Sequence, residues 1–197
     1  MKMSETGEQR SVLSMIADPP NAIAGICALM AGVQAGLAFV PTRIEIALWR
    51  MFELSPKPVL LAIDRGDIAT AARVLLGHMF FHVNFVHLLL NLTAVLVLGG
   101  IVYREMEARP KAPGSDAAAA FVAFFLISGM AAATAFILAS PQSYQPMIGA
   151  SGGAAGLAGA CTWLFVTRTE DGERRPGAAR NFFMLLIVSA ALIALGY

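Results

Sequence analysis

The sequence predicts an all-α, polytopic transmembrane helical bundle. Of its 197 residues, 57% are hydrophobic and only 14% are charged, and the mean hydropathy is +0.68. Soluble domains contain about 45–50% apolar and about 25% charged residues, so this composition is typical of a membrane protein. About 20 apolar residues are enough to cross a bilayer. The length therefore leaves room for several spans, but not for a separate soluble catalytic domain.

Long uncharged stretches predict five transmembrane spans. The first stretch is too long for the core of a signal peptide, and no small-residue cleavage site follows it. The uncharged stretch 117–167 is divided into two spans by a proline-containing turn at 141–146. After a tail at 1–20, a membrane domain is expected over 21–197, with its spans at about 21–40, 78–102, 117–139, 148–166 and 181–197.

Lysine and arginine residues predict the orientation of these spans. Two lie in the tail 1–20, three in the segment 103–116 and four in the segment 167–180, whereas the segment 140–147 has none. The segment 41–73 has five, but its four acidic residues dilute them. The positive-inside rule therefore places the N-terminus in the cytoplasm, and the segments 41–77 and 140–147 on the outer side. Spans rich in alanine and glycine, joined by compact loops, favour a bacterial inner membrane.

The outer segment 41–77 contains a predicted amphipathic helix. Ile44, Leu48, Met51 and Phe52 recur at a helical spacing, and Trp49 lies beside them. Such a helix could lie at the lipid–water interface, or it could cap the outer ends of the bundle. The sequence leaves both interpretations open.

Charge and cysteine content exclude other classes. A formal net charge of +1 and a pI of about 7.8 give no electrostatic support for a nucleic-acid partner. Cys27 and Cys161 each lie in an apolar run, where a cysteine behaves as a small hydrophobic residue rather than as half of a disulfide.

All three histidines lie in one short window, at positions 78, 82 and 87. On a continuous helix His78 and His82 would point one way, while His87 and Asn91 would share nearly the opposite face. This geometry argues against a metal site, and no second cluster of ligating residues in the spans completes one. Polar side chains at membrane depth usually face the bundle interior or a cavity, where His87 and Asn91 would hydrogen-bond helices together or serve chemistry.

A run of small residues opens the fourth predicted span. Gly152 and Gly156 form a GxxxG face, which is typical of close helix packing with an incidental serine at position 151. In the alternative interpretation, Ser151 faces a water-filled cavity beside the second span. By the predicted topology Ser151 and the histidines lie at similar depth, so His87 and Asn91 could donate hydrogen bonds to a developing oxyanion.

Two motifs lie in the order His87-Leu-Leu-Leu-Asn91 and Gly149-Ala150-Ser151-Gly152. A further histidine, His82, precedes the first motif, and a Gly-Gly pair followed by glutamate lies within residues 98–105. With these motifs, the chain over roughly residues 70–197 resembles the rhomboid family of intramembrane serine proteases. The resemblance implies a six-span bundle, of which five spans are present.

The resemblance also implies a site. Ser151 would be the nucleophile, and His87, Asn91 and the Ser151 N–H would form the oxyanion hole. Gly149 would shape the site, and His82 would have a supporting role. The implied substrates are transmembrane segments of other membrane proteins within the lipid bilayer, and the implied chemistry needs no metal or cofactor.

The chain departs from the family pattern at the general base. Rhomboids use a histidine on the sixth span, whereas every histidine here precedes Ser151 and the sequence stops at Tyr197. A serine without a base is a poor nucleophile, so the chain as given is expected to be inactive. Either a sixth span is missing, or the chain is a pseudoprotease that binds transmembrane clients without cleaving them. The family's Trp-Arg dipeptide appears here as Ala72-Arg73, and the subclass, sorting type or general, stays open.

Overall fold

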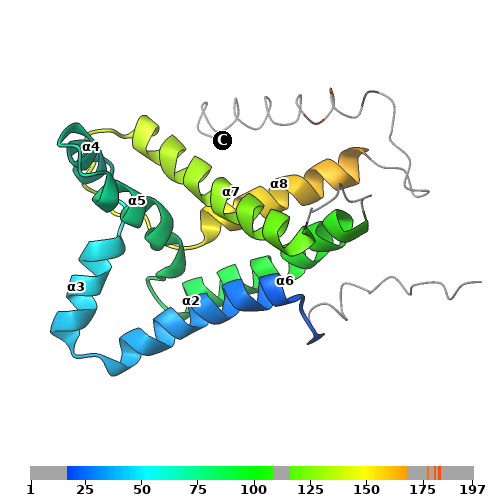
Figure 1. The fold of residues 1–197 in the computed structure, drawn as a ribbon, viewed down its shortest axis with the longest axis horizontal. Helices are drawn as coiled ribbons and strands as arrows, with labels where there is room; N and C mark the ends of the chain where they lie inside the picture. The colour runs from blue at the N-terminus through cyan, green and yellow to red at the C-terminus, as the bar shows by residue number, and fades with distance from the viewer. Residues whose placement is uncertain (1–16, 109–115, 168–176, 178–179, 181, 183–197) are drawn as a thin grey trace, which may run out of the picture. The chain divides into compact units, whose positions relative to one another are not determined.

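The computed structural model describes residues 17–108 and 116–167, together with residues 177, 180 and 182. Within these residues it is helical, with one isolated two-residue bridge and no strand, which confirms the predicted all-α fold (Figure 1). The chain divides into two compact units, 1–157 and 158–197, and the packing described below belongs to the first. In chain order the elements are α2 (Asn21–Phe39), α3 (Thr42–Phe52), α4 (Pro56–Asp64), α5 (Ile68–Gly77), the 3-10 turn η1 (His78–Phe80), α6 (Phe85–Ala108), α7 (Ala117–Ala139) and α8 (Ser151–Thr167).

Three of the described helices, α2, α6 and α7, are long and apolar enough to cross a membrane. The helix α7 covers the predicted span 117–139, and α2 begins with the predicted 21–40 span and ends one residue before the end of that span. The helix α8 corresponds to the predicted span 148–166, but it begins three residues later, at Ser151, and has 17 residues. The predicted span 181–197 lies outside the described residues except for Phe182. The long apolar helices indicate an integral membrane protein.

The second predicted span, 78–102, begins later in the structure. Residues 78–80 form η1, Phe81 is extended (φ −98°, ψ 141°), and α6 starts only at Phe85. Asn84 explains this start, because its side-chain Oδ1 accepts a hydrogen bond from the N–H of His87 at 2.8 Å. Asparagine is among the residues that most favour the position preceding a helix. The histidines are therefore not on one continuous helix, contrary to the expectation from the sequence.

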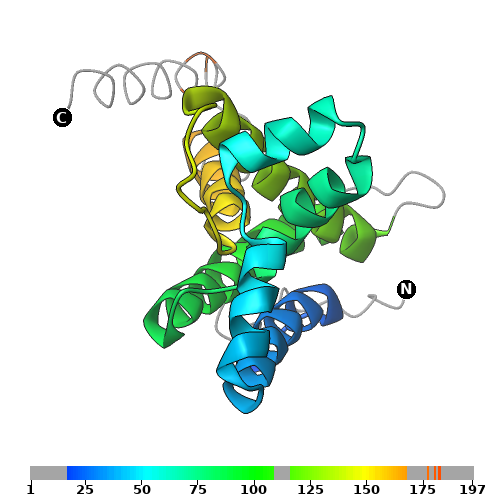
Figure 2. The ribbon, with the colours of Figure 1, turned by 90° about the vertical axis from the view of Figure 1, so that its left-hand side faces the viewer.

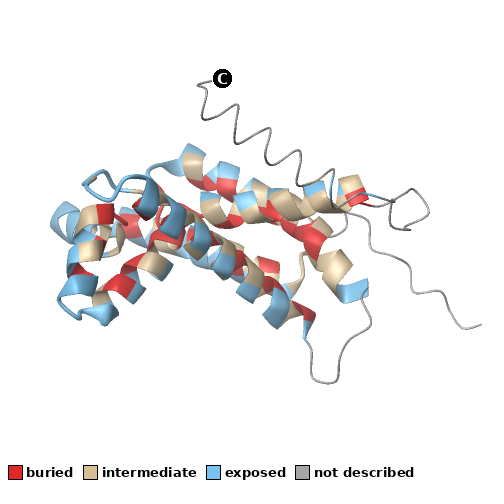
Figure 3. Cartoon of the chain, turned by 90° about the horizontal axis from the view of Figure 1, so that it is seen from above, coloured by how far each residue is buried: buried red, intermediate tan, exposed pale blue. Residues whose placement is uncertain are grey.

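The helices α2, α6 and α7 pack closely at glycine. A Cβ built on Gly99 of α6 would lie 3.0 Å from Cζ of Phe121 and 3.5 Å from Cδ1 of Ile23. Phe121 and Phe125 of α7 are fully buried, as is Ile23 of α2. Buried and exposed positions alternate along these helices, as Figure 3 shows. Dispersion contacts at such close approaches stabilise helix association in lipid, where no hydrophobic effect operates between helices.

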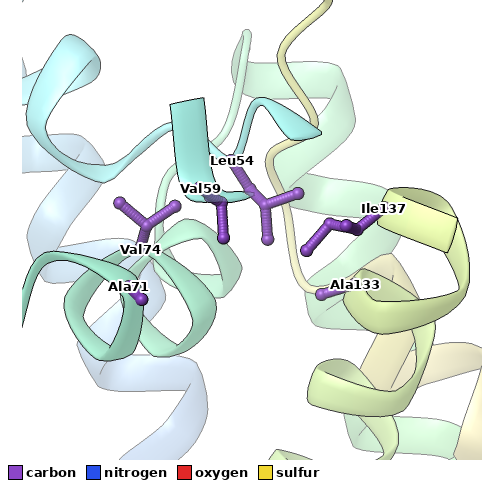
Figure 4. Packing of buried hydrophobic residues seen from close by; sticks show 6 residues of the cluster. All are labelled: Leu54, Val59, Ala71, Val74, Ala133 and Ile137. Carbon is purple, nitrogen blue, oxygen red and sulfur yellow. The ribbon is translucent and has the colours of Figure 1, made fainter. Parts of the chain in front are cut away.

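The segment 41–77, predicted to lie on the outer side, folds into the three short helices α3, α4 and α5 (Figure 2). Pro56 begins α4, and Asp67 precedes α5 and accepts the Thr70 N–H at 3.0 Å. A buried apolar cluster joins this segment to the C-terminal end of α7. Figure 4 shows its members, which are Leu54, Val59, Ala71, Val74, Ala133 and Ile137.

The amphipathic helix predicted in this segment is α3. The ring of Phe52 stacks on Phe81 with centroids 4.8 Å apart, and Trp49 meets Phe81 edge-on at 6.4 Å. Ile44 and Met51 are exposed. One side of α3 therefore packs on the residues that follow η1, and its other side presents apolar side chains outward. Contact of that side with lipid stays a prediction.

Candidate active site

The candidate site begins with the first turn of α6. His87 is the third residue of α6, half-buried, and Asn91 lies one turn further along and is buried. The Asn91 Nδ2 donates a hydrogen bond to the carbonyl oxygen of His87 at 2.8 Å. A side-chain amide has two N–H donors, so this bond leaves one of them for another acceptor.

The second component is the turn that precedes α8. Gly149 has φ +109°, a backbone conformation that side chains other than hydrogen rarely adopt. Its N–H donates to the carbonyl oxygen of His78 at 2.9 Å, and the Ala150 N–H donates to Nε2 of His82 at 3.4 Å. The N–H groups of the two residues before Ser151 are therefore held by η1 and by the segment that joins η1 to α6.

The imidazole of His87 lies against this turn. A Cβ built on Gly149 would stand 2.6 Å from Cε1 and 2.8 Å from Nε2 of His87. A side chain at position 149 would therefore collide with His87 as well as strain the backbone. The structure brings His87 and Gly149 together, and the role of Gly149 in shaping an active site stays a prediction.

His82 lies between the two components. It is fully buried, and its ring meets the His87 ring edge-on with centroids 5.3 Å apart. Because Nε2 accepts the Ala150 N–H, a neutral His82 carries its proton on Nδ1, and that atom has no hydrogen-bond partner among the described residues. The contact between His82 and His87 was missed from the sequence, because a continuous helix would have pointed the two rings apart.

Ser151 is the first residue of α8, and its side chain is exposed. Its hydroxyl makes no hydrogen bond to any residue that the structure describes, His82, His87 and Asn91 included. The first backbone hydrogen bond at this end joins the Ala154 N–H to the Ala150 carbonyl at 2.9 Å. The N–H of Ser151 is therefore one of the unpaired donors at the positive end of the helix dipole.

The GxxxG face holds α8 against α7. A Cβ built on Gly152 would stand 2.7 Å from Cβ of Ala132, and a Cβ on Gly156 would overlap the side chain of Ser128. The predicted close packing is thus present at Gly152 and Gly156. Ser151 precedes this face by one residue, so close packing of the glycines does not bury the serine.

The connector between α7 and α8 is hydrogen-bonded to the segment 41–77. Leu54 and Met147 form an antiparallel bridge, in which the two N–H···O distances are 3.1 and 2.8 Å. The Ser55 Oγ donates to the carbonyl oxygen of Tyr144 at 3.3 Å, and the Lys57 N–H donates to that of Ser143 at 3.0 Å. These bonds fix the connector a few residues before Gly149.

Two contributors to this geometry were not found from the sequence. The first is Asn84, whose position directly before an apolar run is a recognised helix-start signal that could have located the start of α6. The second is the bridge between Leu54 and Met147, which joins residues 93 positions apart in a single pair and leaves no periodic signal.

Comparison with known proteins gives one match. A sequence model described as the Rhomboid domain matches residues 70–197, which is well over half of the chain. The matched range contains η1, α6, α7 and α8 with the turn that precedes Ser151. No curated protein and no solved structure matches the chain.

Proposed function

Because the chain belongs to the rhomboid family, whose members are generally intramembrane serine proteases, we propose that it hydrolyses peptide bonds in transmembrane segments of other membrane proteins. Ser151 is the proposed nucleophile. The observation that carries the proposal is the position of Ser151, exposed at the start of α8 and directly after a turn that His78, His82 and His87 contact. A substrate carbonyl could reach the serine there without displacing a packed side chain.

We assign the oxyanion hole to the Ser151 N–H, His87 and Asn91. The Ser151 N–H is a helix-terminal donor without an intrahelical partner. Asn91 retains one amide N–H beyond the bond to the His87 carbonyl, and His87 lies against Gly149. Donors placed where charge develops supply the largest single contribution in many acyl-transfer reactions, and loss of one donor typically lowers kcat by about 10²–10³.

We assign the general base to none of the three histidines. His78 Nδ1 lies 3.0 Å from the carbonyl oxygen of Val74, and His82 Nε2 accepts the Ala150 N–H at 3.4 Å. His87 serves as a donor in this proposal. The first measurement is therefore the intact mass of the natural protein, compared with 20.8 kDa for this chain. A larger mass directs the search for the base to the added residues.

A second candidate function is binding of transmembrane clients without cleavage. The observation that favours it is that no histidine is hydrogen-bonded to the Ser151 hydroxyl, although the structure describes all three histidines. In such a pseudoprotease the fold and the small-residue packing would be retained for binding.

Fluorophosphonate labelling separates the two functions. The natural full-length protein in its own membranes should react with a fluorophosphonate probe, and Ser151→Ala should abolish the reaction. Ser140→Ala is the matched control, because Ser140 is exposed in the same connector but lies away from the turn at Gly149. A protein that never labels, and in which Ser151→Ala leaves client binding unchanged, is the pseudoprotease.

A further inference from the structure

A cavity of about 120 Å³ lies in the outer segment, away from the turn that carries Ser151. It has room for several water molecules, and so for a small polar group. Its wall combines charged, hydroxyl and apolar side chains, and no part of the proposed peptidase chemistry uses it. The lining residues are Arg50, Met51, Glu53, Ser55, Pro58, Val59, Thr70, Arg73 and Val74.

The charged residues of this wall do not neutralise one another. No ion pair joins Glu53 to Arg50 or Arg73, three residues that the structure describes in full. The Arg73 Nε donates to the Met51 carbonyl at 3.2 Å, and its Nη2 donates to the Thr70 Oγ1 at 3.4 Å. A guanidinium has five N–H donors, so Arg73 keeps donors for a ligand.

The charge balance favours a ligand that carries both signs. Arg50 and Arg73 are positive and Glu53 is negative, and Asp67 lies close enough to Arg73 for their charges to interact. A purely anionic group would be repelled by the carboxylate of Glu53, and a purely cationic group would be repelled by the guanidinium groups of Arg50 and Arg73. A zwitterion avoids both conflicts, since its anionic part can contact the arginines while its cationic part contacts Glu53.

We propose that this cavity binds the headgroup of an aminophospholipid, with the phosphate on Arg50 and Arg73 and the ammonium on Glu53. Arginine suits the phosphate because its planar fork of donors matches two phosphate oxygens. The surroundings favour a lipid over a soluble zwitterion. Apolar side chains are exposed on the same three helices, which would place the cavity at the boundary between headgroups and acyl chains; they are Ile44, Ile46, Leu61, Ile63 and Ile68.

The cavity shares its wall with elements that reach the connector. Val59 and Val74 line the cavity and also belong to the buried cluster drawn in Figure 4. Ser55 lines it too, and the Ser55 hydroxyl donates to the Tyr144 carbonyl. A bound headgroup would therefore stabilise the outer segment and, through Ser55, its attachment to the connector.

Native mass spectrometry of the purified full chain tests the proposal. The delipidated protein is titrated with phosphatidylethanolamine, with phosphatidylglycerol and with soluble phosphoethanolamine. Arg50→Gln should weaken binding of both lipids about tenfold, as expected for loss of one charge-assisted hydrogen bond. Glu53→Gln should weaken binding of phosphatidylethanolamine by a similar factor, whereas binding of phosphatidylglycerol should not weaken, because its anionic headgroup no longer meets a carboxylate. Arg43→Gln is the matched control, because Arg43 is exposed on the same helix and does not line the cavity.

Two results would overturn the proposal. One is equal affinity for phosphatidylethanolamine in the wild type, Arg50→Gln and Arg43→Gln. The other is binding of soluble phosphoethanolamine as tight as that of the lipid, which would assign the cavity to a soluble ligand. Arg50→Lys guards against a folding artefact, because it keeps the charge but not the planar fork, and it should bind with intermediate affinity.

Discussion

The imidazole of His87 lies so close to Gly149 that a Cβ on the glycine would stand 2.6 Å from Cε1 of the histidine. This contact joins the first turn of α6 to the turn before α8. It depends on a residue without a side chain, and the φ of +109° at Gly149 sets the same requirement independently. The position of the proposed nucleophile and that of its proposed oxyanion donor are therefore coupled through one glycine.

Gly149→Ala should damage both stability and reactivity. The strained φ alone costs about 1–3 kcal/mol for a residue with a Cβ, and relief of the clash must move His87. In the natural full-length protein we expect a lower free energy of unfolding in mixed micelles and at least a tenfold slower reaction of Ser151 with a fluorophosphonate. Gly32→Ala in α2, where a Cβ meets nothing within 4 Å, should change neither. Wild-type labelling in Gly149→Ala would contradict this interpretation.

His82 should stabilise the turn through its acceptor nitrogen. His82→Ala removes the side-chain acceptor that the described part of the chain gives the buried Ala150 N–H, and an unsatisfied buried donor costs about 1–3 kcal/mol. His82→Gln retains a side-chain acceptor and should recover part of this loss. Thermal unfolding of the two variants measures the difference. Equal destabilisation by Ala and Gln would mean that ring packing, not the hydrogen bond, is what His82 contributes.

The contact between α7 and α8 should not tolerate a methyl group at Gly152. In Gly152→Ala the new Cβ would stand 2.7 Å from Cβ of Ala132 and 3.3 Å from Cα of Gly129. Overpacking of this kind typically costs about 1–3 kcal/mol, because backbone as well as side chain must shift. Denaturant titration in micelles should show this loss for Gly152→Ala and none for Gly36→Ala, whose Cβ meets nothing within 4 Å. Equal stabilities of the two variants would contradict this, because they would mean that Ala132 and Gly129 can shift to accept the methyl group without cost.

Asp67 should stabilise α5 in a pH-dependent manner. Its pKa is held below the ordinary value, first by the Thr70 backbone N–H, then by the Thr70 side chain, and also by the charge of Arg73. A lowered folded pKa means that the contribution is complete above the unfolded pKa of about 3.9 and is lost as the pH falls through the folded value. Asp67→Ala should therefore destabilise the protein at about pH 6 and have a much smaller effect at about pH 2.5. An effect of equal size at both pH values would contradict this.

Much of the fold could be predicted because composition and charge mark the spans directly. The helix α7 matches its prediction at both ends. Asp116 lies directly before the first residue of α7, where its carboxylate accepts a hydrogen bond from the Ala118 N–H, and Ser140 directly follows the last residue of α7. The start of α6 was predicted too early, because residues 78–84 contain no Asp, Glu, Lys or Arg and so continue the uncharged stretch of the span. Only the hydrogen bond of Asn84 to the His87 N–H places the boundary, and hydropathy does not detect it.

The sequence could predict which residues belong to the candidate site better than it could predict the contacts between them. Ser151, His87, Asn91 and Gly149 could be named from two short motifs. The contact of His82 with His87 could not, because it depends on the non-helical residues between η1 and α6. The Asn91 amide bonded to the His87 carbonyl is likewise a result of local geometry that spacing alone does not specify.

The predicted orientation can be tested with single cysteines. Cys27 and Cys161 are the two cysteines of the chain and are first replaced by alanine. Ser140→Cys follows the last residue of α7, and Glu107→Cys lies in the last turn of α6; both positions are exposed. By the positive-inside rule, an impermeant maleimide should label Ser140→Cys in intact cells, and Glu107→Cys only after lysis. The reverse labelling pattern would mean that the whole bundle has the opposite orientation in the membrane.

This orientation decides on which side the proposed reaction and the proposed lipid site lie. Ser140 begins the connector that carries Gly149, and the bridge between Leu54 and Met147 ties the same connector to the outer segment. Labelling of Ser140→Cys from outside would therefore place both Ser151 and the cavity at Arg50 towards the outer leaflet. Aminophospholipid added to that leaflet alone should then be sufficient to occupy the cavity, whereas the inverted orientation would require the inner leaflet.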